Sequence, residues 1–408
     1  MNTKQAERYR TDLEKCVRCG GCKAWCPTFD EDLLEGMGAR GRLTLLRKLQ
    51  EGGINPSELL NDRIFSCILC GACEGTCPLG VDITESIYRG RALLQETDKR
   101  RRVLRRLVRF SSRWPDLAFR IARMGSHVLL PILAKRGIIP CAPELPDVPL
   151  RTSEQVFRVG KKKGRVAIFT GCSGNYVFPY LGEALIRVLQ KLRYEVVLPK
   201  GEVCCGTPLR SLGLEEEAVK LAKKNVRAFD RLKVDAILSI CPTCTYTIRD
   251  EYPKIMGEGL EKATDISVFL KDKLDPARSI GKTVAYHDPC HLRYGLGVTK
   301  EPREIIRKAG VHVREPEDQG CCGFGGLFCF SFREMSDRIL EKRSAKIIDT
   351  EADAVVTSCP GCMLQLGRNI TDRPVLHLVE LIEEAYCDRS EDKPEKYVKD
   401  QEREPTLF

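Results

Sequence analysis

Two pairs of adjacent cysteines mark this chain of 408 residues. Cys321-Cys322-Gly323 lies in the C-terminal half, and Cys204-Cys205-Gly206 repeats it upstream. Thiols that are neighbours in the chain are poorly placed for a disulfide, whereas thiolates are ligands that zinc and iron–sulfur clusters prefer. The two pairs therefore predict two sites at which several thiolates bind metal.

Each pair belongs to a longer module with the same order of cysteines. A single cysteine precedes the pair and a C-x-x-C motif follows it, with 31 and 35 intervening residues in the first module and 30 and 36 in the second. The offset of 118 residues between Cys172 and Cys290 identifies the modules as internal repeats. The ten module cysteines are Cys172, Cys204, Cys205, Cys241, Cys244, Cys290, Cys321, Cys322, Cys359 and Cys362. A cubane needs four thiolates, so five per module suggest a larger cluster or one with a spare ligand.

Residues 1–97 hold two further cysteine runs, each with the spacing C-x-x-C-x-x-C-x-x-x-C-P. This spacing resembles the bacterial two-cluster ferredoxin signature, in which the fourth cysteine of each run ligates the other cluster. The resemblance implies two cubane 4Fe-4S clusters, one held by Cys16, Cys19, Cys22 and Cys77 and the other by Cys67, Cys70, Cys73 and Cys26. The alternative is a zinc ribbon, but zinc needs only four ligands in two pairs.

The chain has 21 cysteines and begins with the polar residues Asn2 to Gln5, without a signal-like apolar stretch. Thiols stay reduced and available for metal in the cytosol, so we expect a cytoplasmic protein with iron–sulfur or zinc ligands. No apolar run approaches the roughly 18 residues of a spanning helix, so we expect no membrane span. Peripheral contact with the inner face of the membrane is the further location that we consider.

Positive charge is concentrated in one segment. The chain carries +10, yet residues 99–165 carry 18 Lys/Arg against four Asp/Glu, so the rest sums to −4. No nucleic-acid-reading module accompanies this charge, so we expect no nucleic-acid partner. Apolar residues recur at helical spacing from Val103 to Phe110 among arginines, which predicts a basic amphipathic helix that Pro115 ends. That helix either packs on its own protein or faces a membrane or a partner.

Both modules alternate strands and helices, which predicts the α/β class with parallel sheets. Predicted strands at 164–168, 235–240, 283–287 and 353–357 lie just before cysteines, and binding sites lie at the carboxyl ends of such strands. We expect a mostly helical two-cluster ferredoxin domain followed by two βαβ-type modules. The predicted boundaries are 1–97 for the ferredoxin domain, 98–163 for a basic helical connector, 164–275 and 276–387 for the modules, and 388–408 for a disordered tail.

The module pattern resembles the cysteine-rich CCG domain of heterodisulfide reductase catalytic subunits, glycolate oxidase iron–sulfur subunits and lactate-utilisation iron–sulfur proteins. In the reductases this domain binds a noncubane 4Fe-4S cluster, so the resemblance implies up to two such clusters here. In retaining all ten module cysteines, this chain is similar to the reductases. Ala39 to Leu43 and the arginine-rich connector look like the glycolate oxidase type, and the CCGFGGLF stretch from Cys321 to Phe328 looks like the lactate type.

Two functions follow from the resemblance. In the first, the chain is the iron–sulfur subunit of a flavin-linked glycolate or lactate dehydrogenase and relays single electrons to an acceptor, which a membrane subunit could supply. The chain carries no G-x-G-x-x-G between a strand and a helix, so the FAD would belong to a partner flavoprotein. In the second, the ten module cysteines are catalytic and reduce a disulfide. A zinc-stabilised scaffold is the third alternative, because a relative in this superfamily places zinc at one module.

His287 and His291 flank Cys290. Either histidine could donate a hydrogen bond to a cluster sulfur, shuttle a proton or simply support the turn, and we favour the structural role. Cys141, Cys329 and Cys387 remain outside the ligand sets and are expected to be small buried apolar side chains.

Overall fold

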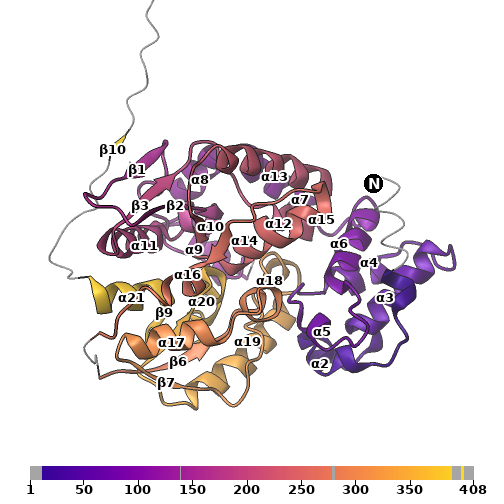
Figure 1. Cartoon of the computed structure of the whole chain (residues 1–408). Helices are drawn as coiled ribbons and strands as arrows, with labels where there is room; N and C mark the ends of the chain where they lie inside the picture. The colour runs from indigo at the N-terminus through magenta and orange to yellow at the C-terminus, as the bar shows by residue number, and fades with distance from the viewer. Residues whose placement is uncertain (1–11, 138, 278–280, 388–396, 399–408) are drawn as a thin grey trace, which may run out of the picture.

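The computed structural model describes residues 12–137, 139–277, 281–387 and 397–398. Figure 1 shows a helical N-terminal part, in indigo and purple, beside a larger part that contains two sheets. The expected α/β fold with an N-terminal helical domain and two repeats is confirmed. Within the described residues, no single helix is both long and apolar enough to cross a bilayer.

The N-terminal domain is built from short helices around the two cysteine runs. Its elements are η1 (Gly21–Lys23), α2 (Pro27–Asp32), η2 (Glu35–Met37), α3 (Ala39–Gln50), α4 (Glu58–Phe65), α5 (Ala72–Gly75) and α6 (Ile83–Leu94). Leu46, Ile64 and Ile87 are fully buried in the core that these helices share. The side chain of Ser57 caps α4 by accepting a hydrogen bond from the backbone amide of Leu60.

Three helices follow: α7 (Arg102–Arg113), α8 (Pro115–Met124) and α9 (Leu129–Lys135). Pro115 is the first residue of α8, so it starts a helix, and the non-helical ψ of 64° at Trp114 separates α8 from α7. The predicted basic helix and the break at Pro115 agree with this arrangement. Strand β1 (Gln155–Phe157) lies within the predicted connector but pairs antiparallel with β3, so this segment already belongs to the first sheet.

Four strands of each module have the same order, and the first sheet has two further strands at one edge. The first sheet has the order β10-β1-β3-β2-β4-β5 and the second has the order β7-β6-β8-β9. The strands are β2 (Gly164–Ile168), β3 (Tyr194–Leu198), β4 (Ala236–Ser239), β5 (Ala263–Asp265), β6 (Thr283–His287), β7 (His312–Arg314), β8 (Ala354–Thr357), β9 (Val375–His377) and β10 (Tyr397–Val398). The four repeated strands of each module are parallel. Residues 388–396 and 399–408 of the predicted tail lie outside the described part of the chain, and Tyr397–Val398 pair with β1.

Helices connect these strands. In the first module they are α10 (Gly171–Tyr176), α11 (Pro179–Lys191), α12 (Thr207–Ser211), α13 (Glu215–Asp230), α14 (Pro242–Tyr246), the π-helix η3 (Thr247–Glu251), α15 (Tyr252–Met256) and α16 (Ile266–Leu270). In the second they are the π-helix η4 (His291–Gly295), α17 (Lys300–Lys308), α18 (Phe328–Ser331), α19 (Arg333–Ile348), α20 (Pro360–Leu366) and α21 (Leu378–Tyr386).

The modules pack against each other reciprocally. Helix α11 of the first module packs on α21 of the second, and α16 of the first packs on α17 of the second. Helix α17 is the counterpart of α11, and α21, which follows β9 as α16 follows β5, is the counterpart of α16, so each module offers the same pair of helices to the other. Leu185, Leu270, Ile305 and Leu381 lie in the one apolar cluster that both modules share. The modules therefore form a pseudo-two-fold pair with a common core.

Candidate iron–sulfur sites

The five cysteines of the second module lie together at the carboxyl ends of β6, β7 and β8. Cys290 Sγ is 3.9 Å from Cys321 Sγ, and Cys322 Sγ is 3.4 Å from Cys362 Sγ. Cys321 also lies within hydrogen-bonding reach of Cys322, and Cys359 within reach of Cys362. The second module thus gathers all five predicted cysteines in one group.

Glycine is required after the second cysteine pair. Gly323 has φ of +80°, and a Cβ there would lie 2.6 Å from the carbonyl oxygen of Ser336. Its backbone amide donates a 3.3 Å hydrogen bond to Cys321 Sγ. The Cys-Cys-Gly motif therefore sets both the turn and an amide donor to sulfur, because only glycine fits this backbone.

The first module repeats this arrangement. Cys204 lies within hydrogen-bonding reach of Cys172 and Cys205, and Cys244 within reach of Cys205 and Cys241. Cys172 is exposed, whereas Cys205, Cys241 and Cys244 are buried. The exposed member gives this site an opening to solvent.

The two module sites are neighbours. Cys241 and Cys359, the first cysteines of the two C-x-x-C motifs, lie within hydrogen-bonding reach of each other. The two residues are related by the offset of 118, so the contact lies at the pseudo-two-fold axis. Spacing alone does not predict this contact, because it depends on how the modules pack.

The buried thiols fit a metal cluster electrostatically. Hydrogen bonding with Cys290 and Cys322 favours the thiol form of Cys321 and raises its pKa, and burial raises it further. The same causes, with Cys172 and Cys205 as neighbours, raise the pKa of Cys204. Grouped buried thiols resist ionisation unless a cation compensates their charge. A cluster of irons supplies such a charge, so the donor set fits the group that the sequence predicts.

The N-terminal cysteines divide between two cavities. One cavity is lined by Cys26, Cys67, Cys70 and Cys73. The other is lined by Cys16, Cys19, Cys22 and Cys77. The fourth cysteine of each run thus lies with the first three of the other run, as the ferredoxin resemblance implies.

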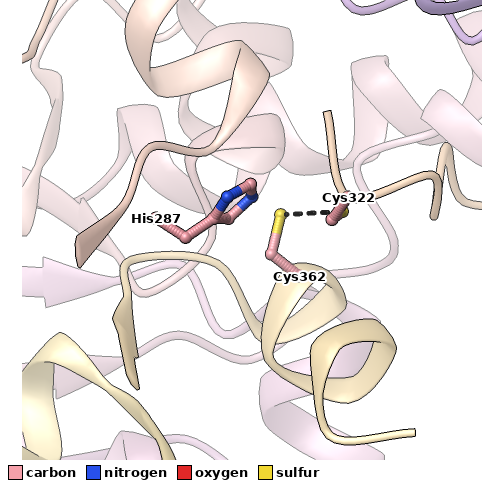
Figure 2. Close-up of side chains that lie close together, drawn as sticks. All are labelled: His287, Cys322 and Cys362. Carbon is pink, nitrogen blue, oxygen red and sulfur yellow. Dashed lines mark hydrogen bonds between the residues drawn. The ribbon is translucent and has the colours of Figure 1, made fainter. Parts of the chain in front are cut away.

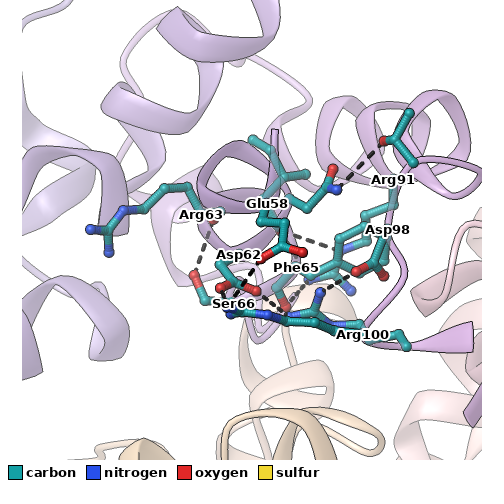
Figure 3. A network of polar contacts seen from close by, with 12 residues as sticks. Glu58, Asp62, Arg63, Phe65, Ser66, Arg91, Asp98 and Arg100 are labelled. Carbon is teal, nitrogen blue, oxygen red and sulfur yellow. Dashed lines mark hydrogen bonds and ion pairs between the residues drawn. The ribbon is translucent and has the colours of Figure 1, made fainter. Parts of the chain in front are cut away.

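Buried arginines hold the loop that leads into the second run (Figure 3). Arg42 donates to the carbonyl oxygen of Arg63 at 2.7 Å and to Ser66 Oγ at 2.9 Å. Arg91 donates to the carbonyl oxygens of Phe65 and Cys67, and also to that of Ser211 in the first module at 2.8 Å. Burial lowers the pKa of Arg91 to about 10. These carbonyl dipoles stabilise the buried guanidinium cations. The hydrogen bond to Ser211 also joins the ferredoxin domain to α12.

The loop of the second run touches the second module. Cys70 lies near Cys290: burial raises the pKa of Cys70, and the charge of the nearby Cys290 raises it further. A Cβ on Gly71 would lie 3.5 Å from Cβ of Tyr294 in η4. One N-terminal cavity therefore opens toward the site of the second module.

His291 joins three parts of the molecule. Its Nδ1 shares a 2.9 Å hydrogen bond with Thr243 Oγ1 of the first module. Its ring also reaches the backbone of Leu69 in the ferredoxin domain and stacks on Tyr246 at 5.7 Å. Burial lowers the pKa of His291. These contacts support a structural role, one of the roles considered from the sequence.

His287 faces the sulfurs of the second module (Figure 2). The ring is 0% exposed, and its ligand atom lies within 4.8 Å of those of Cys322 and Cys362. Its Nδ1 accepts a 3.1 Å hydrogen bond from Arg343 Nε. Since a guanidinium only donates, the neutral ring must carry its proton on Nε2, which is buried without a hydrogen-bond partner among the described residues, while the ring lies near Cys322. The unpartnered Nε2 proton of His287 thus lies beside the sulfur atoms of this group.

Among the described residues the first module has no imidazole at the equivalent position, and its Cys205 lies 3.4 Å from the hydroxyl of Thr207 instead. The strand register pairs Ile168 with Leu238 and Tyr286 with Val356, so Phe169 is the counterpart of His287. Phe169 is fully buried and stacks on Phe229. Aligning the chain with itself at the offset of 118 would have identified this difference from sequence.

The three cysteines outside the ligand sets are located as follows. Cys329 is fully buried and donates to the carbonyl oxygen of Gly326 at 3.1 Å. Cys141 and Cys387 are partly buried. Burial raises the pKa of both Cys141 and Cys329.

Comparison with known families agrees with this geometry. The family described as "Cysteine-rich domain" matches residues 166–249 and 284–367, and the family described as "4Fe-4S dicluster domain" matches residues 12–81. The chain therefore belongs to the iron–sulfur proteins that join a dicluster domain to two cysteine-rich domains. The resemblance inferred from the cysteine spacing is confirmed.

The chain also resembles particular proteins along nearly its whole length. "Probable glycolate oxidase iron-sulfur subunit" of Bacillus subtilis (strain 168) is 29% identical over 92% of this chain and 94% of that protein. A component of the dihydromethanophenazine:CoB--CoM heterodisulfide reductase of Methanosarcina acetivorans is 29% identical over 88% of this chain and 89% of that protein. Both names denote subunits of oxidoreductases, and the Bacillus subtilis name denotes an iron–sulfur subunit. A crystal structure of a hypothetical protein from Helicobacter pylori, with a TM-score of 0.52 and 10% identity over 95% of this chain and 74% of that chain, shares the fold.

Proposed function

We propose that this chain is the electron-transfer subunit of a flavin-linked 2-hydroxyacid dehydrogenase of the glycolate or lactate type. A partner flavoprotein would carry the FAD and oxidise the substrate. The name of the Bacillus subtilis relative supports this assignment. Bound iron–sulfur clusters would supply one-electron carriers.

The proposed ligands are the eighteen cysteines of the four groups described above. Cys16, Cys19, Cys22 and Cys77 would hold one cubane, and Cys26, Cys67, Cys70 and Cys73 would hold the other. Each module would hold a noncubane 4Fe-4S cluster with its five cysteines. The proximity of Cys70 to Cys290 is the observation that carries the proposal, because it brings a dicluster site near a module site, and Cys70 and Cys321 pack against the same apolar cluster.

The protein residues would fix the route between these groups. Arg91 holds the loop of Cys67 against the first module, and His291 bridges the loop of Leu69 to both modules. These contacts keep the carriers close together without a flexible hinge. The acceptor would be a membrane subunit, with the complex in the cytoplasm at the inner face of the membrane.

Anaerobic iron and acid-labile sulfide analysis tests the cluster assignment. Four 4Fe-4S centres require about sixteen irons per chain. The electron-transfer assignment is tested by adding the chain to its co-purified flavoprotein and following dye reduction that depends on glycolate or lactate. Zinc in place of iron would refute the clusters, and dye reduction by the flavoprotein that the chain does not accelerate would refute the relay.

A second function is favoured by a separate observation. The two module sites meet at Cys241 and Cys359, and both retain all five cysteines. This arrangement suits a heterodisulfide reductase-like catalytic subunit, in which adjacent noncubane clusters cleave a disulfide with electrons that the cubanes deliver. The Methanosarcina relative supports this alternative. Turnover of a small disulfide with reduced viologen would establish it, and no turnover by fully loaded protein would exclude it.

A further inference from the structure

Half of the large apolar side chains that the structure exposes lie in one short segment. Of twenty such residues among the described part of the chain, ten fall between positions 103 and 132, on α7, α8 and α9. Eight of them follow strict alternate spacings of four and three residues: Val103, Leu107, Phe110, Trp114, Leu117, Ile121, Met124 and Val128. Leu107 is 59% exposed and Met124 88% exposed. The breaks at Trp114 and between α8 and α9 place these residues on successive helices, and together they are called the stripe. So many exposed apolar side chains in one short segment mark an interaction surface.

The opposite face of α7 is already occupied by the protein itself. Arg105 donates to the carbonyl oxygen of Leu212 at 3.0 Å, and Val108 is buried with Leu209 and Leu212. Arg109 pairs with Glu217 at 2.8 Å. The helix is therefore fixed on the first module by one side and presents its apolar stripe on the other.

Arginines flank the stripe at the same repeat. Arg106, Arg113 and Arg120 are seven residues apart and each lies three or four residues from members of the stripe. All three are exposed, and none forms an ion pair with the residues that the structure describes. Asp116 is the one acidic residue between positions 102 and 137, and it accepts a 2.7 Å hydrogen bond from Tyr176 Oη. The surface thus combines apolar contact with uncompensated positive charge.

The composition of α8 and α9 indicates the kind of partner. Together these helices are long and apolar enough for a bilayer, but they are bent by 78° at the break between them. Two helices bent in this way are better suited to lie in the plane of a membrane interface than to cross the bilayer. Basic helices with Trp, Phe and Leu on one face bind anionic lipid surfaces in this manner.

We propose that the α7–α9 surface, formed by this stripe and by Arg106, Arg113 and Arg120, binds membranes that contain anionic phospholipids. The apolar side chains would enter the boundary between headgroups and acyl chains, and the arginines would contact lipid phosphates. A second copy of the chain is a poor partner for this surface, because pairing two such surfaces would bring the arginines of both copies together. The inference rests on the peripheral location in the proposed function but not on the route of the electrons.

Vesicle co-sedimentation of the iron-loaded full-length protein tests the proposal. The wild-type protein should pellet with vesicles of phosphatidylcholine mixed with phosphatidylglycerol, less with phosphatidylcholine alone, and less at high salt. Replacing both Leu117 and Ile121 by Glu should weaken binding at least about tenfold. The matched control replaces Leu59 and Leu93, which are comparably exposed on α4 and α6, by Glu and should bind as wild type.

The charge contribution has its own control. Changing Arg106, Arg113 and Arg120 to Glu should weaken binding at least about tenfold, since each basic residue near an anionic surface contributes about 1 kcal/mol. Changing Lys220, Lys223 and Lys224, exposed on α13, to Glu alters the net charge equally and should have a much smaller effect. Iron content should be the same in all variants, which separates loss of the surface from loss of the clusters.

Three outcomes would overturn the proposal. They are wild-type protein that ignores anionic vesicles, surface variants that bind as well as their controls, and a wild-type dimer that the surface variants convert to monomer while vesicles bind neither form. The last outcome would assign the surface to a second copy. Failure of vesicle binding with intact dye reduction would reject the lipid surface and leave the electron-transfer function standing.

Discussion

At the scale of single residues, the two modules differ at one buried position beside their cysteines. The second module has His287 there, and the first module has Phe169. Arg343 fixes the tautomer of His287, so its Nε2 proton is available to sulfur near Cys322. Hydrogen bonds to cluster sulfurs favour the reduced state, and the hydrophobic Phe169 offers none. The donors beside the two module sites therefore differ, with the imidazole of His287 near Cys322 and the hydroxyl of Thr207 near Cys205, and under our assignment the two clusters are expected to differ in potential.

His287→Phe, which copies the first module, should lower the midpoint potential of the second module cluster. A hydrogen bond that differs by about 1 kcal/mol between oxidation states corresponds to about 40 mV for one electron. A redox titration followed by electron paramagnetic resonance measures the shift. His312→Phe, on the exposed strand β7, is the control. Identical potentials in wild type and His287→Phe, at full iron content, would contradict the donor role.

Cys322→Ala should remove the second module cluster and leave both cubanes, with a loss of about four irons per chain. The buried Cys329, seven residues away and outside the predicted ligands, gives the matched control Cys329→Ala, which should retain its iron. Iron analysis with cubane electron paramagnetic resonance signals checks both variants. An iron count in Cys322→Ala equal to that of the control would refute the ligand assignment.

At the scale of secondary structure, the sequence was most informative where cysteines follow strands. Strand β6 has the predicted bounds Thr283–His287, and apolar strands before each C-x-x-C were expected at β4 and β8. Strand β1 was missed because its three residues lie in a basic segment and pair only with strands distant in sequence, β3 and β10. The π-helices η3 and η4 were missed because no simple residue pattern distinguishes them from α-helix.

Arg91 shows how tertiary contacts hold a cysteine loop in place. Arg91→Met removes the donors to Phe65, Cys67 and Ser211, and each buried carbonyl left unsatisfied costs about 1–3 kcal/mol. The melting temperature of the loaded protein should fall clearly. Arg100→Met, at a 59% exposed side chain that pairs with Glu58 and Asp62, should cost less than about 1 kcal/mol. Equal losses in the two variants would show that Arg91 does not clamp the loop.

At the scale of the whole molecule, the internal repeat was readable from cysteine spacing, but the joining of the parts was not. The contact of Cys241 with Cys359 follows from the reciprocal packing of α11 on α21 and α16 on α17. The proximity of Cys70 to Cys290 follows from the docking of the ferredoxin domain. Both depend on residues far apart in the chain, so local patterns carry no signal for them.

The same docking buries charge between α6, α12 and η3. Arg210 contacts Glu85 at 2.7 Å and Glu251 at 3.6 Å, and all three side chains are at most 5% exposed. Burial raises the pKa of Glu251 to about 7, although Arg210 opposes the shift. A carboxyl with a raised folded pKa binds a proton more tightly in the folded state. Its stabilising contribution is present at acid pH and is lost as pH rises toward 7.

Glu251→Gln should therefore flatten the pH dependence of stability. Between pH 5.5 and 8 the wild-type protein should lose melting temperature relative to the variant, by an amount equivalent to on the order of 2–3 kcal/mol, since each pKa unit is worth about 1.4 kcal/mol. Differential scanning calorimetry of the loaded proteins at matched scan rates measures this difference. Glu96→Gln, at an exposed carboxylate after α6, controls for the loss of one charge. Parallel pH profiles for wild type and Glu251→Gln would mean that Glu251 is ionised throughout, with Arg210 outweighing the cost of its burial.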